Sequence, residues 1–260
     1  MEEQLTNSLK DINVVVTGAG RGLGAALALI LSDLGCNVIL CGRSLGALDI
    51  IAGHIETRTG RHPKRVVIDL ADAAKIDAAA REIVLSFPVV DVLINNGAMW
   101  LEHRQAPYNA SEVMSVIGST VTGTFLFTQT LLPALQESKR PDVVTIGSIS
   151  GLPNANLHNV AVPFYAAKHG QTAVADGLRQ MMFGTPVRSI CIHPPWLEDV
   201  SPLDAEWDTV SSRIKGEPAT NHDIVDAVVY AITRPRHITI ASMIIDSDSQ
   251  GIDFRSHLKT

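Results

Sequence analysis

The fold of this chain is decided by one stretch, Thr17-Gly18-Ala19-Gly20-Arg21-Gly22-Leu23-Gly24. It follows directly on the apolar run Ile12–Val16, which is typical of a buried strand, and it leads into a segment of helical period, Gly22–Leu34. Glycines permit a tight turn and a close approach of the backbone to a ligand, and the helix that follows offers unpaired N–H groups at its positive end. The stretch therefore predicts a strand–turn–helix unit that holds the pyrophosphate of a dinucleotide.

Short apolar runs alternate with segments of helical period along the rest of the chain. This alternation predicts βαβ units, and apolar runs without strict alternation suit a parallel sheet that helices cover on both faces. We therefore expect an α/β fold of the Rossmann type, in three layers, with a doubly wound parallel sheet of about seven strands. The predicted strands are Ile12–Val16, Val38–Cys41, Val66–Ile68, Val90–Ile94, Val143–Ile146, Val187–Ile192 and Ile238–Ile245. The predicted helices are Gly22–Leu34, Leu45–Arg58, Ala73–Ser86, Ser111–Gln136, Pro163–Phe183 and His222–Thr233.

Composition and charge narrow the choice of partners. The chain has 260 residues, of which 46% are hydrophobic and 18% charged, so we expect a single globular domain over residues 1–260. A net charge of −6 gives no basic footprint, which argues against nucleic acid and anionic membranes and favours a small-molecule partner. The sequence has no secretory signal pattern, no apolar run long enough to span a bilayer, and three cysteines in apolar surroundings. We therefore expect a cytoplasmic protein.

The end of the second predicted strand favours NADP(H) as the cofactor. Gly42 stands where an acid would hold the 2′-hydroxyl of NAD, and Arg43 follows it. Arg43 and Arg21 are able to form charge-assisted bonds to a 2′-phosphate. Each arginine alone is equally well explained as a solvated surface charge, but together with the missing acid they favour NADP(H). Asp69, which follows the third strand and precedes Leu70, is predicted to meet the adenine edge, with a loop cap as its alternative role.

Further motifs resemble the short-chain dehydrogenase/reductase family, in its branch with a Thr-Gly-x-x-x-Gly-x-Gly turn. Asn95-Asn96-Gly97-Ala98 is similar to the family's Asn-Asn-Ala-Gly, and Gly147-Ser148-Ile149-Ser150-Gly151 carries a serine at the family's catalytic position. Lys168 matches the family's lysine. The tail, with Thr233-Arg234-Pro235-Arg236-His237-Ile238-Thr239-Ile240, looks like the subgroup of NADP-dependent dehydrogenases that act on 3-hydroxy acids and serine.

The resemblance implies hydride transfer between a nicotinamide and a carbonyl or alcohol carbon. In the family a tyrosine is the general acid or base, a lysine lowers the pKa of its phenol, and a serine polarises the substrate oxygen. The catalytic residues implied here are Ser148, Tyr165 and Lys168. The implied cofactor residues are Gly18, Arg21, Gly22, Leu23, Gly24, Arg43, Asp69, Leu70, Asn95 and Lys168. No metal site is expected.

The catalytic motif departs from the family pattern. The family spaces its tyrosine and lysine four apart, but four residues before Lys168 lies Phe164, and Tyr165 lies three before it. Positions three and four apart share roughly one helix face, so Tyr165 has two open roles: it approaches Lys168, or it packs ordinarily while Phe164 fills the catalytic position. The family's helix asparagine is Thr120 here, and its Pro-Gly after the sixth strand is Pro194-Pro195.

These departures leave the function open between two classes. The leading hypothesis is an NADP(H)-dependent oxidoreductase acting on a small carbonyl or alcohol substrate, with substrate loops at residues 152–162 and 194–218. The alternative is an NADP(H)-binding family member without redox activity, such as a sensor, a partner subunit, or a non-redox lyase or isomerase. Three histidines are candidate compensating acids, with His193 best placed: His158, His169 and His193. Trp100 and Trp196 are candidate walls of an apolar pocket, and the resemblance implies a homodimer or homotetramer.

Overall fold

The computed structural model describes residues 8–105, 107–155 and 160–247 of the chain. His158 and part of the predicted loop 152–162 lie outside the described residues, as do both ends of the predicted domain. In the described ranges, no helix is long and apolar enough to cross a membrane.

Seven strands form one parallel sheet in the order β3-β2-β1-β4-β5-β6-β9. The order reverses beside β1, as a doubly wound sheet requires, so the predicted fold class is confirmed. The strands are β1 (Asn13–Thr17), β2 (Asn37–Gly42), β3 (Lys64–Val67), β4 (Val92–Asn95), β5 (Asp142–Ile146), β6 (Arg188–His193) and β9 (Ser242–Ile244).

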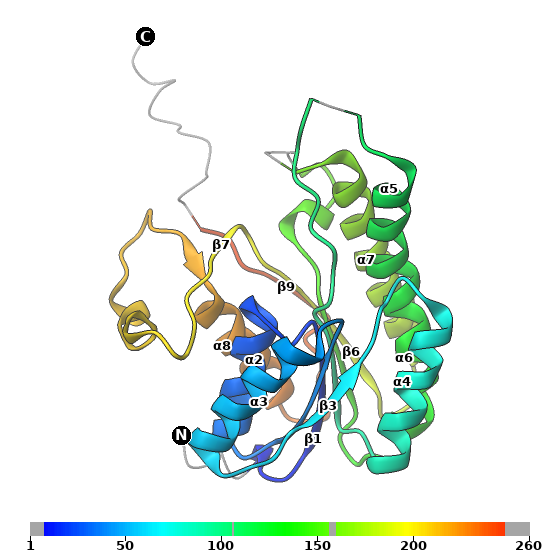
Figure 1. The fold of residues 1–260 in the computed structure, drawn as a ribbon, viewed down its shortest axis with the longest axis vertical. Helices are drawn as coiled ribbons and strands as arrows, with labels where there is room; N and C mark the ends of the chain where they lie inside the picture. Colours follow the sequence, from blue (N-terminus) through cyan, green and yellow to red (C-terminus); the bar gives the residue numbers. More distant parts are fainter. Residues whose placement is uncertain (1–7, 106, 156–159, 248–260) are drawn as a thin grey trace.

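Helices cover the sheet on both faces and complete the three layers (Figure 1). One hydrophobic cluster joins the sheet to α2 (Gly22–Asp33), α3 (Leu45–Thr59) and α8 (Asn221–Ile232). A second joins it to α4 (Ala73–Ser86), α6 (Gly123–Gln136) and α7 (Val162–Met181). The central strands are apolar on both sides for this reason, and every residue of β5 and β6 is buried.

The predicted helix Ser111–Gln136 is present, but a π-helical turn divides it. It consists of α5 (Ala110–Ile117), a π-helical turn (Gly118–Thr122) and α6. At Gly123 the backbone of the helix lies close to the loop after β3. A Cβ atom at this position would overlap the carbonyl oxygen of Leu70. The wider turn accommodates this close approach, which only a glycine allows.

The predicted last strand, Ile238–Ile245, is too long. Only β9 pairs with β6, and it lies at the edge of the sheet, where one neighbour supports it instead of two. Inside the predicted loop 194–218, β7 (Leu197–Glu198) is followed by a 3₁₀ helix (Ala205–Ser212). β7 pairs with β8 (Ala219–Thr220) in a small parallel sheet that leads into α8.

Candidate functional site

A cleft of about 920 Å³ opens where β1, β2, β3 and β4 end. Parallel strands bring the loops that follow them to one edge of the sheet, so the cleft collects segments that are far apart in sequence. The predicted cofactor residues that line it are Gly18, Arg21, Gly22, Leu23, Gly24, Arg43, Asp69 and Leu70.

The glycine turn has the backbone shape that its sequence predicts. Gly18 and Gly22 have φ angles of 68° and 56°, in the left-handed region that favours glycine. A Cβ atom on Gly24 would overlap the carbonyl oxygen of Gly18 and come within 2.6 Å of Nδ2 of Asn96. The turn is therefore closed so tightly that only glycine fits at its last position.

Hydrogen bonds hold this turn against the loop after β4. The hydroxyl of Thr17 accepts from the backbone N–H groups of Asn96 (3.0 Å) and Gly97 (2.8 Å), and it donates to the carbonyl oxygen of Ile94 (3.2 Å). Nδ2 of Asn96 donates to the carbonyl oxygen of Thr17 over 3.0 Å. The floor of the cleft is thus fixed before any ligand arrives.

The N-terminus of α2 opens into the cleft. Arg21, its N-cap residue, makes no side-chain cap hydrogen bond, and the first turn of the helix contains no acidic residue. The first N–H groups of a helix have no partner inside the helix, and its positive dipole end adds to them. The arrangement suits a phosphate group.

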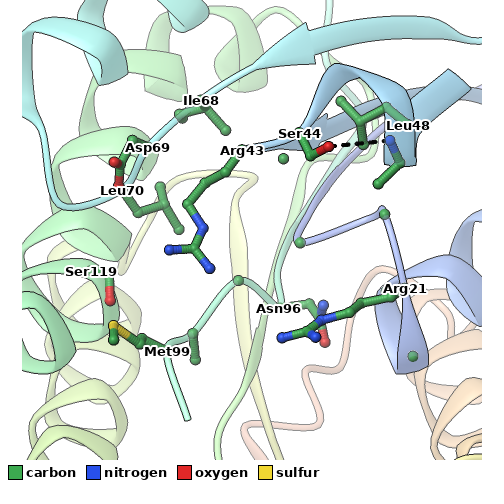
Figure 2. Close-up of a pocket in the computed structure, with 18 of the residues that line it drawn as sticks. Arg21, Arg43, Ser44, Leu48, Ile68, Asp69, Leu70, Asn96, Met99 and Ser119 are labelled. Atoms are coloured by element: carbon green, nitrogen blue, oxygen red, sulfur yellow. Dashed lines mark hydrogen bonds between the residues drawn. The ribbon is translucent and has the colours of Figure 1, made fainter. Parts of the chain in front are cut away.

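Two guanidinium groups face the same space. In Figure 2, Arg43 extends from the end of β2 into the cleft, and Arg21 reaches across from the start of α2 toward Asn96. Neither arginine forms a salt bridge with another residue in the described ranges. Both charges are therefore free to meet an anionic ligand, and Gly42, not an acid, occupies the end of β2 before Arg43.

Asp69 caps its own loop and also lines the cleft. Its Oδ1 accepts from the backbone N–H of Ala71 over 3.1 Å, which is a local loop cap. Its Oδ2 lies 4.0 Å from Nζ of Lys75. Together with Leu70 it also forms the wall of the cleft beside Arg43 (Figure 2).

Asn95 does not line the cleft. Its side chain is buried and its Nδ2 donates to Oγ1 of Thr128 on α6 over 2.8 Å. Successive side chains of a strand point to opposite faces, and Leu93 and Asn95 share the face that α6 covers. The next residue, Asn96, lines the cleft instead.

Ser148 lies directly after β5, beside the end of β6. Its hydroxyl oxygen accepts from the backbone N–H of Ser150 over 3.1 Å. Its carbonyl oxygen lies 3.2 Å from Nδ1 of His193. The backbone N–H of Ile149 donates to the carbonyl oxygen of Pro194 over 2.9 Å, so the loop is held on both sides of Ser148.

Lys168 is buried on α7, close to the end of β5. Its Nζ donates to the carbonyl oxygen of Ile146 over 3.0 Å and to Oε1 of Gln171 over 2.9 Å. Burial disfavours the charged form and lowers the pKa of Lys168 to about 8. The ammonium therefore begins to lose its proton only slightly above neutral pH.

The two aromatic residues before Lys168 point in different directions. The ring of Phe164 lies 5.8 Å from Nζ of Lys168 and packs edge-on against Trp100, with 4.6 Å between the ring centroids. The hydroxyl of Tyr165 donates to the carbonyl oxygen of Ala155 over 2.8 Å, and its ring packs on His169. In this structure it is Phe164 that lies beside the lysine, one helical turn away.

Comparison with known families gives the assignment. The sequence model of the short chain dehydrogenases matches residues 12–209, which is well over half of the chain. The chain belongs to the short chain dehydrogenase family. Membership makes it an oxidoreductase of this type, and the resemblance found in the sequence is confirmed.

Relatives and solved structures agree with this assignment. An uncharacterized oxidoreductase of Staphylococcus aureus strain USA300 is 28% identical over 237 residues, which are 91% of this chain and 97% of the relative. One from Staphylococcus epidermidis is 29% identical over 238 residues, 91% of this chain and 97% of the relative. A short chain dehydrogenase from Shigella flexneri, solved with NADP, has a TM-score of 0.77 at 23% identity and covers 90% of this chain and 96% of its own. One from Escherichia coli CFT073, solved with NADPH, has a TM-score of 0.78 at 23% identity, with coverages of 92% and 98%.

This short chain dehydrogenase has a threonine where its family has a helix asparagine. Thr120 lies in the π-helical turn, and its buried hydroxyl has no hydrogen-bond partner in the described part of the chain. Its carbonyl oxygen accepts from Oγ1 of Thr124, to which Nε2 of Gln171 donates over 3.3 Å. A polar path thus runs from Lys168 to Thr120.

His193 is buried beside Ser148 and does not line the cleft. Burial lowers the pKa of its imidazole, and the hydrogen bond to the carbonyl of Ser148 partly offsets this. Trp100 and Trp196 are each 54% exposed. His193 therefore holds the loop of Ser148, and the two tryptophans are open to solvent.

Among the residues that line the cleft and were not assigned to the site from the sequence are Asn96 and Asp199. Asn96 is part of the Asn-Asn pair, and strand alternation would have identified it. Asp199 follows β7 and has no local signal. The ranges 8–105, 107–155 and 160–247 contain no group of three or more His, Cys, Asp or Glu side chains placed to hold a metal ion.

Proposed function

We propose that this protein is an NADP(H)-dependent oxidoreductase that transfers hydride between the nicotinamide and a small carbonyl or alcohol substrate. The observation that carries the proposal is the cleft, in which a tight glycine turn, a helix N-terminus and two unpaired guanidinium groups converge. The structural neighbours solved with NADP and NADPH support the choice of cofactor.

The residues present fit this cofactor. The N-terminus of α2 and the glycine turn suit the pyrophosphate, since a side chain at Gly24 would occupy the space of the turn. Arg43 and Arg21 suit a 2′-phosphate, and Asp69 with Leu70 forms the wall beside Arg43. When bound, NADPH supplies the hydride.

The catalytic roles proposed for this chain fall on three side chains. The hydroxyl of Ser148 orients the substrate oxygen, the ammonium of Lys168 stabilises negative charge near it, and Tyr165 supplies the proton. For that step the phenol of Tyr165 must leave the carbonyl of Ala155, on which it rests in this structure. The segments at 152–162 and 194–218 are the proposed substrate walls.

A second function is favoured by one specific observation. Phe164 has no proton to donate, yet its ring lies beside Lys168 and closes on Trp100. This arrangement is compatible with a protein that binds NADP(H) without turnover, as a sensor or a partner subunit. It is also compatible with a non-redox lyase or isomerase.

A two-stage measurement tests the proposed function. Binding of NADPH and NADH to the purified protein is measured by calorimetry, and NADPH consumption is then followed with ketones, aldehydes and 3-oxo acids. Tighter binding of NADPH than NADH, with turnover on one substrate class, is the expected result. Saturable binding without turnover would favour the second function, and absence of binding would overturn both.

We propose that the protein acts as a homodimer or homotetramer in the cytoplasm. Exposed apolar side chains on α6 and α7 support an interface between copies: Phe125 and Met181 border a shallow pocket there. Light scattering coupled to gel filtration measures the assembly, and Met181→Glu is expected to dissociate it. An unchanged mass for that variant would contradict this interface.

A further inference from the structure

A carboxylate lies against the glycine turn of the cleft. Asp199 lines the cleft, and its two oxygens are 3.7 and 3.9 Å from the position that a Cβ atom on Gly22 would occupy. Gly22 is the first residue of α2, where the free N–H groups of the helix attract an anion. A negative charge of the protein itself therefore lies beside the place where a pyrophosphate would be held.

Asn221 holds Asp199 in this position. Nδ2 of Asn221 donates to Oδ1 of Asp199 over 2.6 Å and to the carbonyl oxygen of Val200 over 3.3 Å. Asn221 is buried and begins α8, directly after β8. Because β8 pairs with β7 and Asp199 follows β7, backbone pairing and a side-chain bond both fix the carboxylate. The carboxylate itself is exposed to solvent, so salt can reach it.

Two positive charges also line the cleft, Arg21 directly before Gly22 at the start of α2 and Arg43 after β2. Arg43 extends from the end of β2, on the side of Asp69 and Leu70 (Figure 2). Asp199 follows β6 and β7 in the sequence, and its carboxylate lies beside Gly22 at the start of α2. The cleft thus combines an attractive group for a 2′-phosphate with a repulsive group beside the glycine turn.

We propose that Asp199 is a specificity-determining residue that weakens the binding of dinucleotides by repelling their pyrophosphate. The inference rests on the proposed function, since it requires a dinucleotide in the cleft. Like charges a few ångströms apart disfavour each other, and salt screens this repulsion where solvent reaches it. A ligand that carries the 2′-phosphate but lacks a pyrophosphate escapes the effect.

The test removes the charge and keeps the shape. Asp199→Asn retains an oxygen that accepts from Asn221, and Asp199→Ser is a second neutral variant. Asp208→Asn is the matched control, because it makes the same change in net charge at an exposed residue of the neighbouring 3₁₀ helix that does not line the cleft. Calorimetry gives the Kd of NADPH and of adenosine 2′-monophosphate at low and high salt, and thermal unfolding verifies that each variant is folded.

The Kd of NADPH is expected to fall about tenfold in Asp199→Asn and Asp199→Ser, and to stay unchanged in Asp208→Asn. The gain should shrink as salt is raised, and the Kd of adenosine 2′-monophosphate should not change. An unchanged or higher Kd of NADPH in both Asp199 variants overturns the inference. An equal gain for adenosine 2′-monophosphate also overturns it, because the repulsion would not be directed at the pyrophosphate.

These outcomes separate the inference from the proposed function. If the wild-type protein binds NADPH and the Asp199 variants bind no better, the inference is overturned and the proposed function stands. If neither the wild-type protein nor any variant binds NADPH, both are overturned. Binding that appears only in the Asp199 variants supports the inference directly.

Discussion

The loops after β1 to β4 and those after β5 and β6 meet one edge of the sheet, but they follow the family pattern to different degrees. The first set, here called the cofactor half, is built around the glycine turn, Asn96 and Arg43. The second set, the catalytic half, consists of Ser148, His193 and the start of α7. The cofactor half has the glycine turn that its sequence predicts, whereas the catalytic half has a phenylalanine beside its lysine.

The difference shows that a function carried by the backbone tolerates substitutions better than a function carried by one side chain. The cofactor half works mainly through turn geometry and N–H groups, which many side chains leave intact. The catalytic half depends on the register of one phenol, and a shift by one residue on a helix turns a side chain by about 100°.

Opening the glycine turn of the cofactor half should weaken the binding of NADPH. Gly24→Ala adds a Cβ atom that overlaps the carbonyl oxygen of Gly18, so NADPH binding is expected to weaken at least about 100-fold. Gly53→Ala is the control, because a Cβ atom there meets nothing within 4 Å. Calorimetry measures both, and an unchanged Kd in Gly24→Ala would mean that the cofactor does not depend on this turn.

The catalytic half is tested by removing and adding a phenol. Tyr165→Phe should lower kcat about 100-fold without changing NADPH affinity, since a positioned proton donor contributes about that much. Phe164→Tyr should raise kcat in the Tyr165→Phe background, because it restores a phenol beside Lys168. Tyr230→Phe, on the exposed side of α8, is the control. Full turnover in Tyr165→Phe would assign Tyr165 a purely structural role.

The next largest effect is expected on the preference for NADPH over NADH. Arg43→Ala removes a guanidinium that faces the cleft, and the Kd of NADPH should rise about 30-fold while that of NADH stays the same. Arg81→Ala changes an exposed arginine on α4 that does not line the cleft and serves as the control. Equal losses for NADPH and NADH would show that Arg43 does not recognise the 2′-phosphate.

The smallest expected effect is a dependence of turnover on pH. Burial lowers the pKa of Lys168 to about 8, so its ammonium is present below that pH and is lost as pH rises through it. Turnover that needs the ammonium should fall to half its maximum near that pH. A pH profile of kcat measures this, with Lys168→Arg as a variant that keeps its charge. A flat profile would mean that the charge of Lys168 is not required.

Much of the fold was predictable because its signals are local. Apolar runs, turn glycines and helical periods depend on neighbouring residues, and they predicted seven parallel strands, the layers and the turn at Thr17 to Gly24. The π-helical turn at Gly118–Thr122 was not predicted, because it lies inside a segment of helical period, and neither was the close approach of Gly123 to the carbonyl of Leu70, far away in sequence.

The same division applies to the site. By itself the sequence determined the glycine turn, the absence of an acid beside Arg43 and the shifted spacing of Tyr165 and Lys168. Only the tertiary structure decided that Asn96 and not Asn95 faces the cleft, and that Asp199 lies over Gly22. It also directed the phenol of Tyr165 to Ala155. A backbone turn is specified by the residues within it, but the surroundings of a side chain are set by distant segments that meet only when the sheet is assembled.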